Sequence, residues 1–383
     1  MRNALREDTR AIPQTEPNRL IRHVVDIDPV ADSRYDAFVH AHPDALIYHH
    51  PAWLEVLAKE NGQRPVCLAS EDTTGQLNGI LALFQTRGLP LVGGQLTGRR
   101  LSSLPRTPVA GPLTSDRFAA AALIRAAANR VEDNPVVPLQ IKTASNDFDD
   151  LVDGVVGNRW RPCYMLELPA RTEDLRFGSS RHHARIRSTV NKAEKLNLRI
   201  REAGSEADLK AWYDIYLETM RWHVIPPRSY RFFKAAWDIL RPRGFLRLLV
   251  AEMWESAQPK LLAGSIFLTF GRTFVYAYNG CRRAAFTLQP NDVIQWRAIH
   301  DACNEGFSFY DLGEAPETHT GLSFFKSKWG AQEKWLYRYY YPAPRRFQDS
   351  TLQNRMYPTL RMVWRRLPLK ATMLLGDRLY RYL

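Results

Sequence analysis

The sequence predicts a mixed α/β (α+β) fold of two tandem domains, followed by a C-terminal amphipathic helical tail. The chain has 383 residues, 45% of them hydrophobic, which is enough to bury one large core or two ordinary ones, and the length favours two domains. A helix, a glycine and a strand pair occur twice in the same order: Gly62 and Gly244 are 182 residues apart, and Gly79 and Gly264 are 185 residues apart. Nearly constant offsets indicate a duplicated domain, with chance recurrence in an α+β protein as the alternative.

The first domain is expected over residues 21–168, after a polar leader at residues 1–20 that offers no apolar periodicity and is expected to be disordered. Trp53, Leu54 and Leu57 share one face of a helix that ends at Gly62. Two short apolar runs separated by turn-forming residues then predict an antiparallel pair. The expected elements are a helix at residues 50–57 and strands at 66–70, 78–85 and 163–168.

The second domain is expected over residues 169–345 and repeats this order before extending it. Gly244 and Gly306 are placed to end two of its helices. The expected elements are a helix at residues 230–240, strands at 245–252, 262–268 and 273–280, a helix at 292–304, a strand at 307–313 and a polar loop at 314–320.

The tail, residues 346–383, has the pattern of a basic amphipathic helix. Leu360, Val363, Trp364 and Leu367 form an apolar stripe among arginines, and Pro368 separates it from a second short helix. Docking on a membrane surface and packing back onto the body of the protein account for this pattern equally well.

Cysteine usage and the N-terminal composition indicate a cytoplasmic protein. The four cysteines (Cys67, Cys163, Cys281 and Cys303) are far apart and form no CxxC pair, so neither a disulfide framework nor a zinc site is predicted. The neighbouring His182 and His183 point apart on a helix, and we expect no metal. The N-terminus lacks the apolar stretch of a signal peptide, and no apolar run is long enough to cross a bilayer. Peripheral attachment to the inner face of the membrane, through the tail, is the alternative to a free cytoplasmic location.

The net charge of +13 is unevenly distributed. From Pro342 onward, nine Lys or Arg face two Asp, an excess of +7. Residues 181–201 hold seven Lys or Arg against the single acid Glu194, some of them at near-helical spacing. Such a stripe suits the phosphates of a tRNA backbone or of a nucleotide-linked acceptor, and a plain solvated helix face is the alternative.

The most specific motif follows the predicted strand at residues 307–313. Tyr310-Asp311-Leu312-Gly313 leads through a loop to residues 321–331, Gly-Leu-Ser-Phe-Phe-Lys-Ser-Lys-Trp-Gly-Ala. This arrangement resembles the signature of the FemAB-like transferases of the GNAT superfamily, in which a strand ending in Asp-x-Gly leads to Gly-Leu-x-x-Phe-Lys-x-x-aromatic-Gly. Residues 185–195 resemble the basic helix of that family, and residues 214–233 resemble its acceptor-side segment. The Trp-Arg-Arg-Leu-Pro run at 364–368 is similar to the tail of an exopolysaccharide-associated subgroup.

The resemblance runs from about Arg22 to Tyr341 and implies two GNAT-like (acyl-CoA N-acyltransferase) domains with a substrate channel between them. It also implies an aminoacyl-tRNA donor. Ordinary acetyl-CoA-dependent GNAT enzymes carry a glycine-containing turn that holds the pyrophosphate at a helix N-terminus. Residues 282–287, in the corresponding place, lack the glycine, which disfavours acetyl-CoA. We expect no cofactor other than the donor co-substrate, aminoacyl-tRNA or acyl-CoA.

The resemblance places Lys326 beside the donor ester, where its ammonium would stabilise the oxyanion of acyl transfer. Phe325 and Trp329 are expected to stack on the acyl side chain or a terminal adenine, with core packing as the alternative. Asp311 is the candidate general base, with capping of the turn as the alternative. The expected substrate-binding residues are Arg185, Arg187, Lys192, Arg221, Trp329 and His319.

Three functional hypotheses follow. The first is an aminoacyl-tRNA-dependent transferase acting on an amine or hydroxyl of a cell-envelope, polysaccharide or small-metabolite precursor. The second is an N- or O-acyltransferase of exopolysaccharide biosynthesis that uses acyl-CoA or an acyl-carrier protein. The third is a non-catalytic RNA- or membrane-binding protein, which the intact Phe325-Lys326 motif disfavours.

Overall fold

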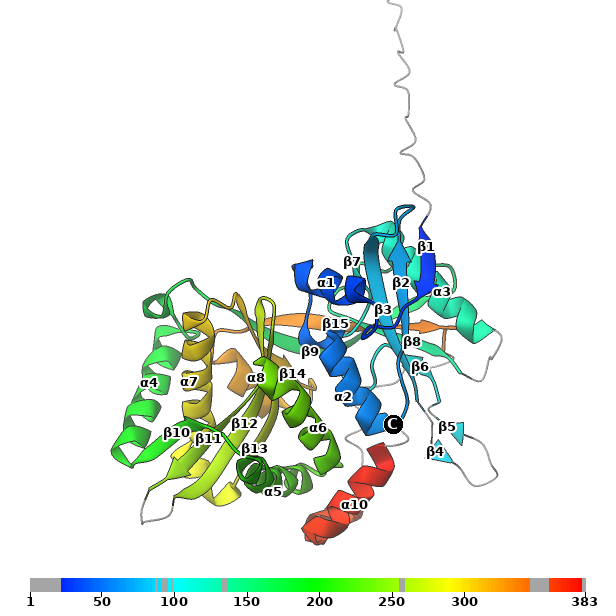
Figure 1. Cartoon of the computed structure of the whole chain (residues 1–383). Coiled ribbons are helices and arrows are strands. Elements are labelled where there is room, and N and C mark those ends of the chain that lie inside the picture. Colours follow the sequence, from blue (N-terminus) through cyan, green and yellow to red (C-terminus); the bar gives the residue numbers. More distant parts are fainter. Residues whose placement is uncertain are drawn as a thin grey trace, which may run out of the picture.

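Two α/β halves share one continuous sheet (Figure 1). The computed structural model describes residues 22–86, 89–90, 96–97, 99–132, 137–254, 259–344 and 358–380, so the leader expected at residues 1–20 lies outside the described residues. The elements of the first half are β1 (His23–Asp26), α1 (Ser33–Ala41), η1 (Ile47–His49), α2 (Pro51–Asn61), β2 (Val66–Glu71), β3 (Leu77–Gln85), β4 (Leu89–Pro90), β5 (Leu96–Thr97), β6 (Leu101–Ser102), β7 (Leu113–Thr114), α3 (Arg117–Glu132), β8 (Leu139–Thr143) and β9 (Val156–Glu167).

The second half continues the alternation of helices and strands. Its elements are η2 (Thr172–Asp174), α4 (Ser180–Lys195), β10 (Leu198–Glu202), α5 (Glu206–His223), α6 (Tyr230–Leu240), η3 (Arg241–Arg243), β11 (Leu246–Met253), β12 (Lys260–Phe270), β13 (Thr273–Cys281), η4 (Arg283–Leu288), α7 (Pro290–Asn304), β14 (Phe309–Glu314), α8 (Thr320–Ser327), β15 (Gln332–Tyr341), α9 (Pro358–Arg366) and α10 (Leu369–Tyr380).

The repeated order predicted from the sequence is present in both halves. Helix α2 has Pro51 at its first position and ends at Gly62, where φ is +69°. The α6 segment ends, after the short η3, at Gly244, where φ is +75°. Each helix is followed by an antiparallel pair, β2 with β3 and β11 with β12. The mixed α/β class and the tandem arrangement are therefore confirmed.

Strand β9 is longer than the sequence indicated. The strand expected at residues 163–168 begins already at Val156. The sequence did not indicate its first half because Asn158, Arg159 and Arg161 interrupt the apolar pattern there. Pairing with β14 on one side and β15 on the other compensates for that composition.

Strand β15 joins the sheets of the two halves. Tyr339 lies opposite Gly157 of β9 and opposite Ile141 of β8. The described strands therefore run in the order β1-β2-β3-β6-β8-β15-β9-β14-β13-β12-β11-β10, with β7 on β3. In Figure 1, β15 crosses from the second half into the first. The last strand of the chain's second half thus completes the sheet of its first half.

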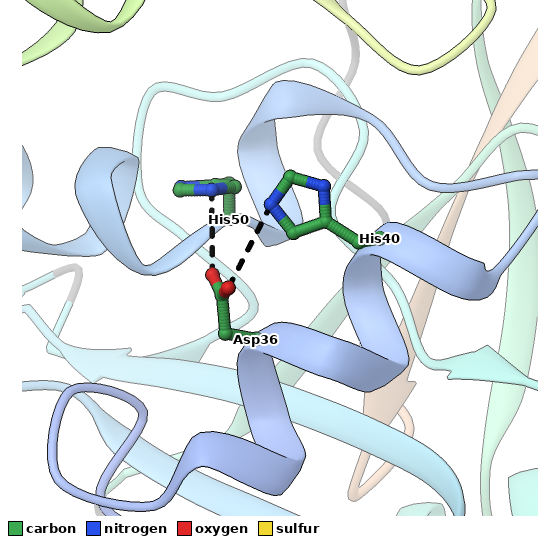
Figure 2. Close-up of side chains that lie close together, drawn as sticks. All are labelled: Asp36, His40 and His50. Carbon is green, nitrogen blue, oxygen red and sulfur yellow. Dashed lines mark ion pairs between the residues drawn. The ribbon is translucent and has the colours of Figure 1, made fainter.

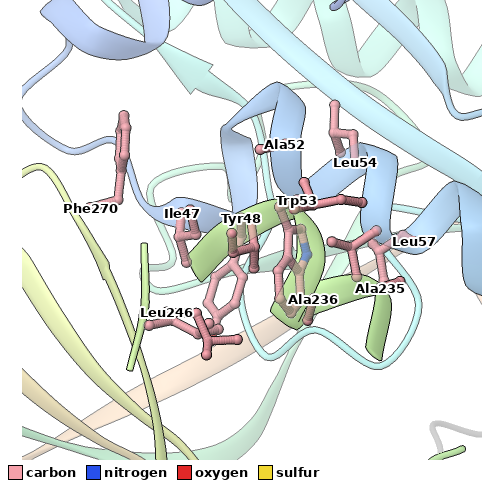
Figure 3. Packing of buried hydrophobic residues seen from close by; sticks show 14 of the residues in the cluster. Ile47, Tyr48, Ala52, Trp53, Leu54, Leu57, Ala235, Ala236, Leu246 and Phe270 are labelled. Carbon is pink, nitrogen blue, oxygen red and sulfur yellow. The ribbon is translucent and has the colours of Figure 1, made fainter. Parts of the chain in front are cut away.

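A hydrophobic cluster also spans both halves (Figure 3). Trp53 of α2 is 1% exposed and meets Phe232 of α6 with ring centroids 5.9 Å apart. Ile47 and Tyr48 of η1 belong to the same cluster as Leu246 of β11. Burial of these large side chains stabilises the contact between the halves by roughly 1.5–3 kcal/mol for each aliphatic or aromatic group. The halves therefore share a core and are not separate bodies joined by a linker.

The tail packs back onto the body of the protein, chiefly onto α5. Arg221 Nη1 donates to the Leu367 carbonyl at 3.1 Å. Gly376 of α10 lies against Pro227, so closely that a Cβ there would overlap the Pro227 carbonyl oxygen. Apolar side chains of both helices stay about half exposed, among them Met362 and Val363 of α9 and Leu374 of α10. The packing alternative is thus observed for α9 and α10, which both contact α5, and membrane docking stays a prediction.

Candidate active site

The two parallel strands at the centre of the second half separate where the motif begins. Strands β13 and β14 pair only through Thr273–Val275 and Phe309–Asp311, after which β13 continues along β12 to Cys281. The pairing of β14 with β9 is irregular between Asp311 and Glu314, and Gly313 there has φ +77°. Bulges of this kind redirect side chains and are common beside active sites. Asp311 therefore lies at the opening between the strands.

Asp311 is buried and its carboxylate holds the turn together. Its Oδ1 accepts the Gly313 N–H at 2.7 Å and the Cys163 thiol at 3.3 Å. Burial raises the pKa of Asp311, and these hydrogen bonds and the nearby Lys326 partly oppose the rise. The side chain caps the turn, as the alternative interpretation expected, and its raised pKa also suits proton transfer.

Lys326 lies on the buried side of the short helix α8 and is 4% exposed. Its Nζ donates to the Glu314 carbonyl oxygen at 2.8 Å. Burial lowers the pKa of Lys326 to about 8, and the neighbouring Cys163, Asp311 and Glu314 oppose the shift. The group is therefore mainly an ammonium at neutral pH, held at the opening with little room for other conformations.

The first half of the chain supplies polar groups near the same opening. Burial raises the pKa of the Tyr48 hydroxyl well above its ordinary value, and Asp311 and Tyr278 add to the shift. Arg228 bonds to Glu60 of α2 at 2.7 Å and to the Tyr278 hydroxyl at 2.7 Å. The sequence did not single out Arg228, Glu60 or Tyr278, because no contiguous motif contains them. Arg228 does fall inside the segment 214–233 that resembles the family's acceptor side.

Two aromatic residues of the motif have different environments. Phe325 is half-buried, with Lys328 Nζ 4.6 Å from its ring centroid. Trp329 has no exposed surface and meets Phe177 edge to face at 5.1 Å. Trp329 therefore belongs to the core in this structure and has no free face on which a ligand could stack.

The basic residues predicted on residues 185–195 lie on α4 with their side chains exposed. Ile186 and Val190 bury the opposite face of this helix, which leaves Arg185, Arg187 and Lys192 at the surface. The start of α4 is next to α8, since the rings of His182 and Phe324 are 5.9 Å apart. Arg187 also lines an open cleft of about 420 Å³, together with Arg176, His183, Trp296 and His300. The structure thus brings the helix to the edge of α8, without contact between these three side chains and Lys326.

Two further predicted residues lie outside the cluster around Lys326. Arg221 binds the tail through Leu367. His319 is exposed at the N-cap position of α8 and accepts no capping hydrogen bond there.

The segment at residues 282–287, which lacks the glycine of a pyrophosphate-binding turn, forms the helical turn η4. Arg282, which precedes it, pairs with Glu218 at 2.8 Å and donates to the Leu261 carbonyl at 3.0 Å. The first turn of α7, which follows, already holds the carboxylate of Asp292, and Lys328 pairs with it at 2.7 Å. A carboxylate at a helix N-terminus occupies the position that favours a bound anion.

Thiol chemistry is disfavoured. All four cysteines are free and buried. Burial raises the pKa of Cys67 and of Cys281 to about 12, and raises that of Cys163 well above its ordinary value. Because the thiolate is the nucleophile, these protonated groups do not suit covalent catalysis.

Asp36, His40 and His50 lie close enough together to consider a metal ion (Figure 2). Asp36 is 3.5 Å from His50 Nε2 and 3.7 Å from His40 Nε2. His50 Nδ1, however, accepts the Ala52 N–H at 3.0 Å as the N-cap of α2, so the neutral ring carries its proton on Nε2. A ligand at Nε2 needs a lone pair there and a proton on Nδ1. The trio therefore fits a structural contact between α1 and α2 better than a metal centre.

Residues 180–326 match the family model described as an acetyltransferase (GNAT) domain. The matched region begins with α4 and ends at Lys326. No curated protein matches the chain.

Solved structures share the fold over most of the chain. FemX is 16% identical with a TM-score of 0.64, and the match covers 83% of this chain and 97% of FemX. The L-PGS of Bacillus licheniformis is 14% identical with a TM-score of 0.53, covering 90% and 97%. The C-terminal domain of a putative lysylphosphatidylglycerol synthetase from Agrobacterium fabrum is 11% identical with a TM-score of 0.54, covering 84% and 93%.

Residues 180–326 thus form an acyltransferase domain of the GNAT type. The chain as a whole has the tandem GNAT-like fold seen in FemX. The predicted resemblance is thus confirmed for the superfamily and the fold. In the described part of the chain, no helix has the length and apolar character needed to cross a bilayer.

Proposed function

We propose that the protein transfers an aminoacyl group from aminoacyl-tRNA to an amine or hydroxyl of a cell-envelope, polysaccharide or small-metabolite precursor. The observation that carries the proposal is the buried ammonium of Lys326, held 2.8 Å from the Glu314 carbonyl where β13 and β14 separate. An activated ester already has a good leaving group, so catalysis needs positioning and stabilisation of the oxyanion. Lys326 supplies the positive charge, and Asp311 is the candidate proton acceptor.

The choice of donor rests on two features. The exposed cations of α4 lie beside α8 and suit a nucleic-acid backbone. The paired carboxylate of Asp292 in the first turn of α7 disfavours a pyrophosphate at that helix end. The protein would act in the cytoplasm, with α9 able to touch the inner face of the membrane through Met362 and Val363.

An acyl-CoA- or acyl-carrier-protein-dependent acyltransferase of exopolysaccharide biosynthesis is the second candidate, favoured by the match to an acetyltransferase (GNAT) domain model. A non-catalytic RNA- or membrane-binding role is the third candidate, and the cost of burying an ammonium at Lys326 counts against it.

The test is transfer of radiolabelled amino acids from a pool of charged tRNAs, or of labelled acyl groups from acyl-CoA, to a small-molecule fraction of cell extract. We expect transfer from tRNA that ribonuclease abolishes, and a rate about 10²- to 10³-fold lower in Lys326→Ala. Lys59→Ala removes a half-exposed lysine and is the matched control. Transfer from acyl-CoA alone would favour the second candidate, and full activity in Lys326→Ala would refute the role of this residue.

A further inference from the structure

Two cations face one another on the sheet that joins the halves. Lys142 of β8 lies directly opposite Arg338 of β15 in the antiparallel pair. Their strand neighbours Ile141 and Tyr339 point to the other face of the sheet and are fully buried in a hydrophobic cluster. Lys142 is 6% exposed and Arg338 is 5% exposed. Like charges directly opposite each other on a sheet are destabilising, and burial increases the cost.

Neither cation has a carboxylate partner in the described part of the chain. Lys142 Nζ donates to the Leu104 carbonyl at 2.6 Å, and Arg338 Nη1 donates to the Pro108 carbonyl at 3.0 Å. The Arg338 guanidinium also lies 5.0 Å from the ring centroid of Trp160. These contacts satisfy single N–H groups and leave the two charges without a directly bound carboxylate.

More positive charge surrounds the pair. Arg100 is close enough to affect the pKa of both Lys142 and Arg338, and Arg161 affects that of Arg338. Burial, followed by these cations, lowers the pKa of Lys142 well below its ordinary value, and burial lowers that of Arg338 to about 10. The carboxylate that acts on both is Glu314, which lies 3.4 Å from Arg161. Lys142 and Arg338 thus lie among further positive charge, with the Glu314 carboxylate as the acid that acts on both.

We propose that Lys142 and Arg338, with Arg100 and Arg161 beside them, bind a phosphate group carried by one of the substrates. Several N–H donors on a planar guanidinium and an adjacent ammonium are the groups that recognise a phosphoryl oxyanion. A bound anion would place a negative charge beside Lys142 and Arg338. It would thereby offset the free-energy cost of burying the two cations.

The proposed site adjoins the candidate active site. Glu314 connects the two: its carbonyl oxygen accepts Lys326 Nζ at 2.8 Å, and its carboxylate pairs with Arg161. Assigning the phosphate to a substrate rests on the proposed function, whereas anion binding itself does not. The site would fix the orientation of a phosphorylated molecule whose reacting group lies toward Lys326.

The test measures thermal unfolding of the full chain in sodium phosphate and in sodium pyrophosphate, against sodium chloride of equal ionic strength. We expect both phosphates to raise the unfolding midpoint of the wild-type protein in a concentration-dependent way. Lys142→Met and Arg338→Met should weaken the apparent affinity about tenfold or more. Arg64→Met removes one cation whose side chain is 90% exposed and should bind as the wild type does.

The unliganded variants provide a second measurement. Lys142→Met removes one of two opposed buried charges, so its unfolding midpoint in sodium chloride should be higher than that of the wild type. If the lysine only stabilised the fold, its replacement would lower the midpoint. If Lys142→Met does not fold, Arg338→Met serves for both measurements. Equal phosphate effects in the wild type and both variants, or no phosphate effect in the wild type, would overturn the proposal.

Further ligands distinguish the source of the phosphate. Stabilisation by coenzyme A or by deacylated tRNA that is lost in Arg338→Met assigns the phosphate to the donor. Stabilisation by pyrophosphate alone assigns it to the acceptor. Because no transfer reaction is needed, the outcome is independent of the assay for the proposed function.

Discussion

The ammonium of Lys326 is buried, and burial disfavours its charged form. Its pKa of about 8 means that the ammonium is lost as the pH rises through that value. If the ammonium stabilises the oxyanion, the rate constant for transfer falls above about pH 8. An arginine keeps its charge at higher pH. In Lys326→Arg, the pH at which the rate constant falls should therefore be higher than in the wild type, even if the maximal rate constant is smaller. A pH profile of the single-turnover rate for both proteins measures the effect, and an unchanged position of the fall would mean that another group titrates.

Single residues were predictable where a contiguous motif contains them. Asp311 and Lys326 were found in this way, and the structure brings them to the same opening. Trp329 was in the motif too, but its burial depends on Phe177, which is distant in sequence. Lys142 and Arg338 alternate with apolar neighbours along their strands, a pattern typical of an exposed strand face. Only the tertiary arrangement shows that this face is covered.

Helices and strands with clear endings were predicted well. Helices α2 and α6 end near glycines with positive φ, and the antiparallel pairs follow as expected. Strand β15 was not foreseen, and the first half of β9 was not either. The charged residues of β9 give no strand periodicity, and the pairing that stabilises it comes from residues 332–341. A pattern of neighbouring residues does not reveal a partner strand that lies so far along the chain.

The contact of α10 with the loop before α6 depends on the absence of a side chain at Gly376. In Gly376→Ala the new Cβ would overlap the Pro227 carbonyl oxygen, so α10 must move away. We expect faster amide hydrogen exchange throughout α10, despite the higher helix propensity of alanine. In Gly204→Ala, the matched control, the added Cβ meets no atom within 4 Å and exchange in α10 should not change. Unchanged exchange in Gly376→Ala would mean that the helix does not hold this position in solution.

At the scale of the whole molecule, two buried histidines near the contact of the halves make stability depend on pH. Burial lowers the pKa of His49 and of His50 to about 4, while Asp36 favours the charged form of His50. Between pH 6.5 and 4 the unfolded chain therefore binds more protons than the folded one, and stability falls as the pH decreases. The loss reaches about 3 kcal/mol for His49 and less for His50.

Urea unfolding at pH 7, 5.5 and 4.5 measures this loss. His49→Gln should lose less stability across the range than the wild type, because the substituted side chain does not titrate. His23→Gln, at an exposed position, should follow the wild type. Equal slopes for all three proteins would assign the acid sensitivity to other groups.

The position of β15 has a consequence for biosynthesis. The edge of β8 that β15 covers is made when the ribosome reaches Thr143, but β15 begins only at Gln332. At roughly 5–20 residues per second, the nascent chain carries an open strand edge for on the order of ten seconds or more. Open edges are sites of aggregation. The N-terminal half therefore cannot complete its sheet as it emerges and must await the synthesis of β15.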